Sequence, residues 1–348
     1  MLSPVVRRLP LENPASRFER FRVEYEEGAP DAALEIYDDQ SQTILSENDS
    51  PDLGFRFSVN PYRGCLHGCA YCYARPSHEY LGFGAGSDFE RKLVVKRRAP
   101  ELLAAAFDKR SWVGELVVFS GNTDCYQPLE KQLELTRRCL EVCARYRNPV
   151  HVITKSALVE RDIDLLQTLS KEAHAGVTLS IPFIDVDVAR AIEPYAPPPS
   201  RRIEAVRRLT EAGINVSVNV APLIPGLNDR DVVPILEAVK DAGATGAGIV
   251  PLRLPGPVAE VFTERLRDAL PLSAEKVLTR IREMRDGKLN EPRFGARFEG
   301  KGRYIETVLE LFAVTTRRLG LDRREMDTSV RANTFRRPGP QLELFGRG

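Results

Sequence analysis

The chain has 348 residues, with 50 lysines and arginines against 49 aspartates and glutamates, so its formal net charge is +1. This balance excludes a uniformly basic nucleic-acid coat and an acidic disordered chain. Hydrophobic residues make up 43% and charged residues 28%, which is typical of a globular protein with a large core. One long domain and two short ones fit equally well.

The first residues do not read as a secretory signal, because no apolar run follows Arg7 and Arg8. The longest uncharged stretch, residues 212–228, contains two prolines and three asparagines, which indicates a buried strand and turn rather than a membrane span. We therefore expect a cytoplasmic protein without membrane contact. All six cysteines lie in the first half of the chain, and because disulfides are rare in the cytosol, clustered cysteines favour metal binding or catalysis.

In chain order, short β-branched runs alternate with amphipathic stretches from about residue 90 onward. The runs are 92–96, 115–121, 149–155, 175–182, 214–224 and 245–254, and the predicted helices that follow them are 100–110, 129–147, 161–173, 200–212, 231–242 and 258–270. This alternation predicts parallel strands joined by right-handed helical crossovers. Polar clusters follow several of the strands, as they do at the carboxyl rim of a barrel, and no GxGxxG motif follows a first strand. The pattern predicts an α/β fold with a full or partial (β/α) barrel.

Three of the cysteines lie close together, just after a short strand predicted over residues 55–59. In residues 60–75 (NPYRGCLHGCAYCYAR), Cys65, Cys69 and Cys72 have a C-x3-C-x2-C spacing. Gly64 and Gly68 allow the backbone to turn tightly around one metal centre. A structural zinc ion normally has four ligands, and the histidine at position 67 is a candidate for the fourth. Three thiolates alone suit an iron–sulfur cluster, which leaves one iron open to a ligand that is not protein.

With Tyr71 before Cys72, the loop resembles the C-x3-C-x-Φ-C loop of radical S-adenosylmethionine (SAM) enzymes, in which Φ is aromatic. The resemblance implies that Cys65, Cys69 and Cys72 hold a [4Fe–4S] cluster whose open iron binds the amino and carboxylate groups of SAM. It also implies a partial (β/α)6 TIM-type barrel. An electron from a reductant such as flavodoxin or ferredoxin would release a 5′-deoxyadenosyl radical, while the protein supplies orientation.

Further blocks resemble one branch of this family, the spore-photoproduct-lyase-like proteins. They are residues 78–90 (HEYLGFGAGSDFE), 123–130 (TDCYQPLE), 153–156 (ITKS), 161–165 (RDIDL) and 222–229 (PLIPGLND). The resemblance implies that Ser180 touches the ribose or carboxylate of SAM and that Leu223 and Ile224 flank its adenine. It also implies that the segment after the second barrel strand meets the amino group of SAM, through Ser120, Gly121, Asn122, Thr123 and Asp124.

Two tyrosines beside the cluster loop, Tyr71 and Tyr73, match those that help a cysteine of the lyase to return a hydrogen atom to its substrate. The cysteine itself does not align. In the lyase it precedes a Thr-Ser-Asp run, whereas here an asparagine precedes the Thr-Asp pair and Cys125 follows that pair. Cys125 is therefore a candidate hydrogen donor from a shifted position, with a packed thiol as the alternative.

The remaining cysteines and two of the histidines favour packing roles. Cys139 and Cys143 are four residues apart on a predicted helix, which indicates small side chains facing a core more than ligands of a second cluster. His151 lies inside a strand that looks buried, and His174 just before another. We expect both to be satisfied packing residues.

Positive charge gathers in places despite the neutral total. Residues 91–110 hold seven basic and two acidic residues, residues 201–208 contain four arginines, and residues 301–348 hold ten basic against six acidic residues. Such clusters usually form a solvated face. If they converge near the rim they would bind phosphates, and that binding would weaken as salt rises.

The last residues, 336–348 (RRPGPQLELFGRG), predict an extended, flexible tail, because Pro338, Gly339 and Pro340 cannot continue a helix. The string QLELF resembles the pentapeptide by which bacterial polymerases and repair factors bind the replication sliding clamp. The matching positions are Gln341, Leu342, Leu344 and Phe345. The apolar side chains would fill a pocket and the glutamine would anchor the backbone. The alternative is a C-terminal latch folded back on the barrel.

We divide the chain into an N-terminal extension (1–50), a radical SAM partial barrel (51–270), a C-terminal helical region (271–335) and the tail (336–348). The expected function is a radical SAM enzyme that acts on nucleic acid, with lyase-type repair of damaged pyrimidines in DNA as the specific reaction. Two alternatives stay open: a radical SAM enzyme that modifies protein or RNA, and a non-catalytic, clamp-tethered iron–sulfur or zinc protein.

Overall fold

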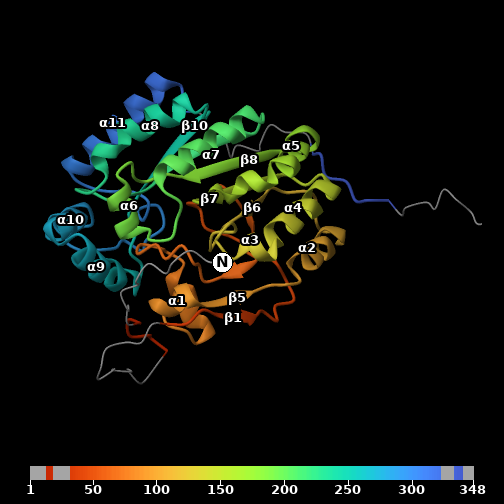
Figure 1. Ribbon diagram of the computed structural model, residues 1–348, viewed down its shortest axis with the longest axis horizontal. Helices are drawn as coiled ribbons and strands as arrows, with labels where there is room; N and C mark the ends of the chain where they lie inside the picture. Colours follow the sequence, from red (N-terminus) through yellow and green to blue (C-terminus); the bar gives the residue numbers. More distant parts are fainter. Residues whose placement is uncertain (1–12, 19–31, 323–332, 340–348) are drawn as a thin grey trace, which may run out of the picture.

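A computed structural model of the chain describes residues 13–18, 32–322 and 333–339 (Figure 1). Its main sheet has the strand order β10-β9-β8-β7-β6-β3-β2. The strands are β2 (Leu45–Glu47), β3 (Phe57–Val59), β6 (Val117–Phe119), β7 (Val150–Thr154), β8 (Ala175–Ser180), β9 (Asn215–Leu223) and β10 (Gly246–Pro251). Neighbours from β3 to β10 pair in parallel, and β2 is antiparallel to β3. The register of β7 and β8 runs from Val150 opposite Ala175 to Thr154 opposite Leu179.

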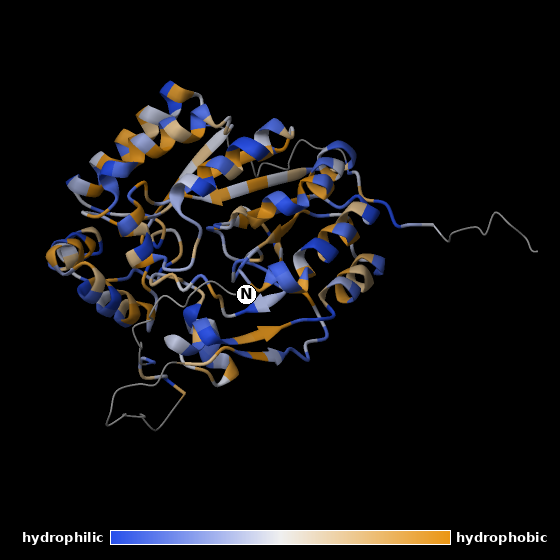
Figure 2. Cartoon of the chain, in the orientation of Figure 1, coloured by the Kyte–Doolittle hydropathy of each residue, from blue (hydrophilic) through white to orange (hydrophobic). Residues whose placement is uncertain are grey.

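Helices cover the outer side of these strands (Figure 1). They are α2 (Ala99–Asp108), α4 (Leu135–Tyr146), α5 (Ile163–Glu172), α7 (Pro199–Glu211), α8 (Val232–Asp241) and α11 (Arg303–Leu319). Figure 2 shows hydrophobic residues along the strands and hydrophilic residues on the outward helix faces. Six parallel strands within the described residues, with helical crossovers between them, form a partial (β/α)6 barrel, and the predicted fold class is confirmed.

One predicted barrel strand belongs elsewhere. The run 92–96 forms β5 (Lys92–Val95), which pairs with β1 (Glu35–Asp38) and β4 (Tyr62–Arg63) in a separate three-stranded sheet. The first barrel strand is instead β3, the short strand before the cysteines. The barrel still has six parallel strands, because β3 takes the place predicted for β5. Apolar alternation identifies a buried strand, but it does not identify the neighbour with which the strand pairs.

The cysteines of α4 face the core, as predicted. Cys139 and Cys143 are fully buried among Leu140, Tyr146 and the strands beneath them. His151 is also satisfied within the core, because its Nε2 lies 2.7 Å from the hydroxyl oxygen of Thr178. These residues pack the barrel, and the described cysteines form no disulfide.

After β10 come α9 (Val258–Ala269) and α10 (Pro271–Met284), which bury a second hydrophobic cluster that also includes Cys69 and Tyr71. Between α10 and α11 the chain crosses to the residues that precede β3. Arg297 forms an ion pair with Asp52 at 2.6 Å, and the Gly295 N–H donates to the same carboxylate at 2.8 Å. This contact joins the β10 side of the partial barrel to its β2–β3 side.

The C-terminal segment 333–339 lies against α2 and α4. Phe335 is buried against Phe107 and Tyr146, the Arg336 N–H donates to the Tyr146 carbonyl at 2.8 Å, and Arg337 donates to the Phe107 carbonyl at 3.1 Å. Arg336 and Arg337 are therefore attached to the barrel, and the predicted tail boundary at residue 336 is placed too early. The sequence could not show this, because nothing in it marks these two arginines as anchored. The QLELF residues lie outside the described part of the chain. None of the described helices is long and apolar enough to cross a membrane.

Candidate iron–sulfur and cofactor site

The cysteine loop begins directly after β4, at the carboxyl edge of the main sheet. Cys65 and Cys69 are buried and Cys72 is partly buried. Gly64 has a φ of +77°, and a Cβ atom on it would lie 2.8 Å from a methyl carbon of Leu93 and 2.9 Å from the Phe89 carbonyl oxygen. The turn that the sequence predicts therefore needs glycine here, both for its backbone angle and for the space it leaves.

Two arginines, one fully buried and one partly buried, hold the outer side of this loop. Arg75 is fully buried and donates to the Cys69 carbonyl at 2.9 and 3.1 Å, to the carbonyls of residues 85 and 86, and to Glu90 at 2.5 Å. Arg265 of α9 donates to the Gly68 carbonyl at 2.7 Å and lies 3.3 Å from Glu90. The main chain between the cysteines is thus fixed by the protein itself.

The start of the loop is fixed from the other side by Gln127, which follows β6. Its amide nitrogen donates to the Gly64 carbonyl at 3.1 Å, and its amide oxygen accepts from the Leu66 N–H at 2.9 Å. Gln127 is fully buried, so both ends of its amide are satisfied where water cannot reach. The Gln127 side chain therefore helps to fix the conformation of the cysteine loop.

Burial raises the pKa of all three cysteine thiols, which opposes thiolate formation. For Cys72, the positive charges of Arg75 and Lys155 act against this effect. For Cys69, Glu193 adds to it, while Lys155 and Arg202 oppose it. Cations thus surround the loop, and a bound metal centre would complete the stabilisation of the thiolates.

These residues fit a cluster better than a single ion. Nowhere in the described ranges do three His, Cys, Asp or Glu side chains converge closely enough for one metal ion. Thiolates that share one zinc ion each lie about 2.3 Å from it, whereas the thiolates around a [4Fe–4S] cluster each bind a different iron and stand further apart. His67 points its Nδ1 at Asp124, 3.5 Å away. The zinc alternative with His67 as fourth ligand therefore finds no support.

The segment after β6 lies beside the cysteine loop and is held to the end of β3. Ser120 has a φ of +75°, and the Asn122 N–H donates to the Asn60 side chain at 2.7 Å. At Gly121 a Cβ atom would lie 2.5 Å from the hydroxyl of Ser58, so only glycine fits. Residues 120–122 therefore present their main chain in a fixed conformation next to the cysteines.

The next two side chains bond within the protein. The Thr123 hydroxyl donates to a carbonyl of β4 at 2.6 Å. Asp124 accepts from the Thr154 hydroxyl at 2.7 Å, from the Lys155 N–H at 2.9 Å, and from His67. Burial acts to raise the pKa of Asp124, but these hydrogen bonds and the nearby histidine lower it to about 2. Asp124 thus ties β6, β7 and the cysteine loop together, and the cofactor contact of residues 120–124 stays a prediction.

The other predicted cofactor residues lie at the ends of β8 and β9. The Ser180 carbonyl accepts from Arg202 at 3.0 Å. Leu223 and Ile224 are fully buried, and Ile224 belongs to the hydrophobic cluster that contains Cys69 and Tyr71. Strand ends far apart in the sequence therefore meet the cysteine loop, and the cofactor roles of these residues stay predictions.

The three predicted catalytic residues have different surroundings. Tyr71 is buried, and its hydroxyl donates to Glu193. Tyr73 is half exposed, and its hydroxyl donates to the Gly121 carbonyl at 3.2 Å. Cys125 is 1% exposed and lies in the main hydrophobic core, where burial and then the charge of Asp124 raise its thiol pKa. Tyr73 alone faces the solvent, and the position of Cys125 favours the packed-thiol alternative.

Comparison with known proteins decides the family. A model of the radical SAM superfamily matches residues 59–239. The chain belongs to the radical SAM superfamily. Uncharacterized relatives include a Mycobacterium tuberculosis protein, 34% identical over 234 residues that cover 67% of this chain and 68% of the relative, and a Methanocaldococcus jannaschii protein, 32% identical over 180 residues that cover 52% and 65%.

Solved structures of spore photoproduct lyase share the fold. The lyase complexed with dinucleoside spore photoproduct has a TM-score of 0.56 and 16% identity, covering 82% of this chain and 78% of that one. A mutant of the lyase with bound AdoMet and the same dinucleoside has a TM-score of 0.55 and 15% identity, covering 82% and 77%. Membership of the superfamily implies a [4Fe–4S] cluster and SAM as cofactors of this enzyme.

Sequence reasoning missed the charged residues around the cluster loop of this radical SAM enzyme. Arg75 stands three residues after Cys72, and Lys155 is part of the ITKS block at the end of a strand. Both positions could therefore have been predicted to lie near the cluster. The positions of Glu193 and Arg202 could not have been predicted in this way, because the two residues are nine positions apart on either side of a proline cluster. Their ion pair, buried beside Tyr71, appears only in the fold.

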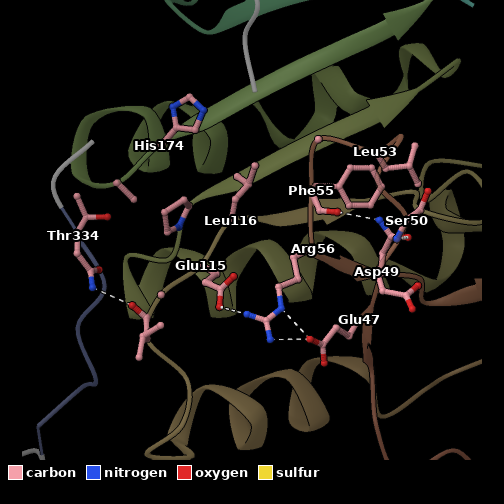
Figure 3. A pocket seen from close by; sticks show the side chains of 17 residues that line it. Glu47, Asp49, Ser50, Leu53, Phe55, Arg56, Glu115, Leu116, His174 and Thr334 are labelled. Atoms are coloured by element: carbon pink, nitrogen blue, oxygen red, sulfur yellow. Dashed lines mark hydrogen bonds and ion pairs between the residues drawn. The ribbon is translucent and has the colours of Figure 1, made fainter. Parts of the chain in front are cut away.

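A separate pocket of about 740 Å³ lies at the opposite edge of the sheet (Figure 3). Its lining includes Arg56, Leu116, Pro149 and His174, each of which directly precedes or begins a barrel strand at its amino end. Chemistry in (β/α) barrels takes place at the carboxyl edge. This pocket is therefore not the cofactor site.

Proposed function

We propose that this radical SAM enzyme acts on nucleic acid and that its reaction is the lyase-type repair of a damaged pyrimidine in DNA. The observation that carries the proposal is the half-exposed Tyr73, next to Cys72 and hydrogen-bonded to Gly121, in a fold shared with spore photoproduct lyase over 82% of the chain. The sequence blocks that resemble the lyase branch support it. Action on RNA or protein is the alternative substrate class.

In this proposal the residues of the chain have separate roles. When bound, the cluster and SAM supply a 5′-deoxyadenosyl radical that abstracts a hydrogen atom from the substrate. Cys65, Cys69 and Cys72 hold the cluster, and the main chain of residues 120–122 orients SAM together with Ser180, Leu223 and Ile224. Tyr73 faces the substrate. Tyr71 holds the cysteine loop in place from inside the fold, through its hydrogen bond to Glu193. A flavodoxin or ferredoxin in the cytoplasm is the proposed source of the electron.

Anaerobic reconstitution tests the cluster and the radical chemistry. We expect about four irons per chain and SAM-dependent formation of 5′-deoxyadenosine, with Cys69→Ala abolishing both. Cys139→Ala, a matched change at a buried thiol of the core, should keep the iron. Iron without any 5′-deoxyadenosine would instead support a non-catalytic iron–sulfur protein.

The substrate class is tested with the reconstituted enzyme and three substrates: an oligodeoxynucleotide that carries pyrimidine photoproducts, its undamaged copy, and an RNA copy. Loss of the photoproduct from DNA alone is the expected result. Loss of no photoproduct, together with modification of RNA or of a protein, would overturn the DNA proposal.

The hydrogen donor is tested in the same assay. If Cys125 returns the hydrogen atom, Cys125→Ala should leave SAM cleavage intact and change the product, for example by trapping an adduct. Its burial leads us to expect an unchanged product, with Tyr73→Phe as the variant that alters it. The two variants therefore separate the two candidates.

We also propose that Gln341, Leu342, Leu344 and Phe345 dock on the bacterial sliding clamp. The support is the sequence of the tail and the net charge of +1, because a tether raises the local concentration of DNA without strong intrinsic affinity. Calorimetric titration of the clamp with the full chain and with a version truncated after Pro340 tests this. Equal heats from the two versions, or no heat from either at micromolar concentration, would exclude the tail as a docking site.

A further inference from the structure

A row of alternating guanidinium groups and aromatic rings lies at the carboxyl edge of the sheet. Arg253 follows β10, and its guanidinium carbon is 4.6 Å from the ring centre of Phe298. The guanidinium carbon of Arg297 is 5.1 Å from the same ring and 4.5 Å from the ring of Phe294. We call Arg253, Phe298, Arg297 and Phe294 the arginine–phenylalanine row.

The inner end of the row lies beside the cysteine loop. Burial lowers the pKa of Arg253, and the charges of Arg297 and Arg285 lower it further, while Tyr73 and Asp52 oppose the shift. Leu252 and Leu254, on either side of Arg253, belong to the hydrophobic cluster that contains Cys69 and Tyr71, so Arg253 lies near the cysteine loop. It also interacts electrostatically with Tyr73, the half-exposed tyrosine next to Cys72. Its Nε is buried without a hydrogen-bond partner in the described part of the chain. A buried N–H donor without a partner is costly unless a ligand accepts from it.

The row is held rigidly by the loop between α10 and α11. Arg285 donates to the Leu252 carbonyl at 2.9 Å, and the Leu254 N–H donates to the Asn290 side chain at 3.2 Å, so this loop is attached to the end of β10. Arg297 is fixed by its ion pair with Asp52. The two ends of the row therefore keep their separation.

The outer end of the row is open to solvent. The Phe294 side chain is 61% exposed, although Arg297 covers one side of its ring. Residues 285–303 contain six basic and three acidic residues, so the surroundings of the ring are positively charged. An exposed aromatic ring in a basic loop, in a row that ends at the free Nε of Arg253, suits an anionic ligand that also carries flat rings.

We infer that the arginine–phenylalanine row binds an unpaired, single-stranded segment of nucleic acid, with a base stacked on Phe294 and a phosphate at Arg253. Bases stack on aromatic and guanidinium faces when a strand is unpaired, and arginines along the path neutralise its phosphates. A duplex hides its base faces and would use the arginines alone. The inference rests on the proposed function, because it assumes that the substrate is nucleic acid.

Fluorescence anisotropy of the reconstituted full-length enzyme tests the row, with three labelled probes of equal length: oligothymidine, an abasic strand and a blunt duplex. Phe294→Ala should weaken oligothymidine binding about 5- to 100-fold and leave abasic-strand binding unchanged. Phe294→Trp should restore the binding of oligothymidine. Leu272→Ala on α10 is the control, because Leu272 is another exposed large apolar residue and lies outside the row.

Arg253→Gln tests the inner end. Loss of one phosphate contact should reduce the slope of log affinity against log salt by about 0.7 for a single strand. Unchanged oligothymidine binding by Phe294→Ala, or an equal loss on the abasic strand, would overturn stacking on Phe294. If the wild-type enzyme repairs DNA while both variants bind as it does, only the row is excluded. If the wild type binds none of the three probes, the proposed function fails as well.

Discussion

The Tyr71 hydroxyl donates a hydrogen bond to Glu193, and the same carboxylate pairs with Arg202. Tyr71, Glu193 and Arg202 are all buried, and Arg202 also donates to the Ser180 carbonyl at the end of β8. The relationship joins the cysteine loop to the strand whose end is expected to meet SAM. The Tyr71 hydroxyl is thus bonded inside the fold, whereas Tyr73, which donates to the Gly121 carbonyl, is half exposed to solvent.

Tyr71→Phe should lower the free energy of unfolding by about 1–3 kcal/mol, because a buried carboxylate loses a hydrogen-bond donor. Tyr73→Phe should cost less than about 1 kcal/mol, since its hydroxyl bonds to one carbonyl at a half-exposed position. Chemical denaturation of the two cluster-free variants measures both. Equal destabilisation would show that the Tyr71–Glu193 bond is not the stronger constraint.

Arg75→Met should destabilise the protein by at least about 3 kcal/mol, because it removes one cation from the buried Glu90 carboxylate and frees the Cys69 carbonyl. The iron content after reconstitution should fall with it, since the loop loses its outer support. Arg97→Met is the matched control, because its ion pair with Asp38 is exposed and should contribute less than about 1 kcal/mol. Full iron content and wild-type stability in Arg75→Met would contradict this role.

The fold class and the cluster ligands could be predicted from the sequence, because both depend on local patterns. Alternating strands and helices imply a parallel α/β fold, polar clusters at the strand ends favour a barrel, and the spacing of Cys65, Cys69 and Cys72 is short enough to be recognised directly. The partner of a strand is a long-range property. Residues 92–95 have the composition of a barrel strand, yet they pair with residues 35–38, more than fifty positions away.

Charged groups inside the fold were harder to predict for a related reason. A sequence shows that Glu193 and Arg202 are charged, and charged residues are buried only when they are paired. Which cation meets which carboxylate depends on the assembled barrel. Arg75 and Arg265, 190 positions apart, meet at the same Glu90. The arginine–phenylalanine row depends on the fold in the same way, because Arg253 and Phe294 come from different elements.

The stability of the protein should depend on pH through Asp124. Its pKa falls from 3.8 to about 2 on folding, so its carboxylate stabilises the fold by about 2 kcal/mol at neutral pH. That contribution is complete above the unfolded pKa and is lost as the pH falls towards 2, with about half of it gone by pH 3. The difference in unfolding free energy between the wild type and Asp124→Asn should therefore shrink between pH 7 and pH 3. A difference that is constant with pH would contradict the shift.

Phe335→Ala should detach the C-terminal segment from the barrel. The ring is 7% exposed, contacts Phe107 and Tyr146, and stacks under the Arg337 guanidinium group at 5.2 Å. Removing a buried phenylalanine ring costs about 3 kcal/mol, and the contacts that remain are hydrogen bonds to main-chain carbonyls, mostly from exposed side chains.

Limited trypsin digestion after Arg336 measures this release, because the Arg336 N–H is otherwise bound to the Tyr146 carbonyl and the next residue, Arg337, is bound to main-chain carbonyls of α2 and the turn after it. Cleavage at residues 336–337 should become fast in Phe335→Ala and stay slow in Leu311→Ala, a change at a partly exposed leucine of α11. Clamp binding by the QLELF string should be the same in both variants, because the docking residues begin at Gln341, after the anchored segment. Loss of clamp binding in Phe335→Ala would show instead that the anchored residues are part of the docking element.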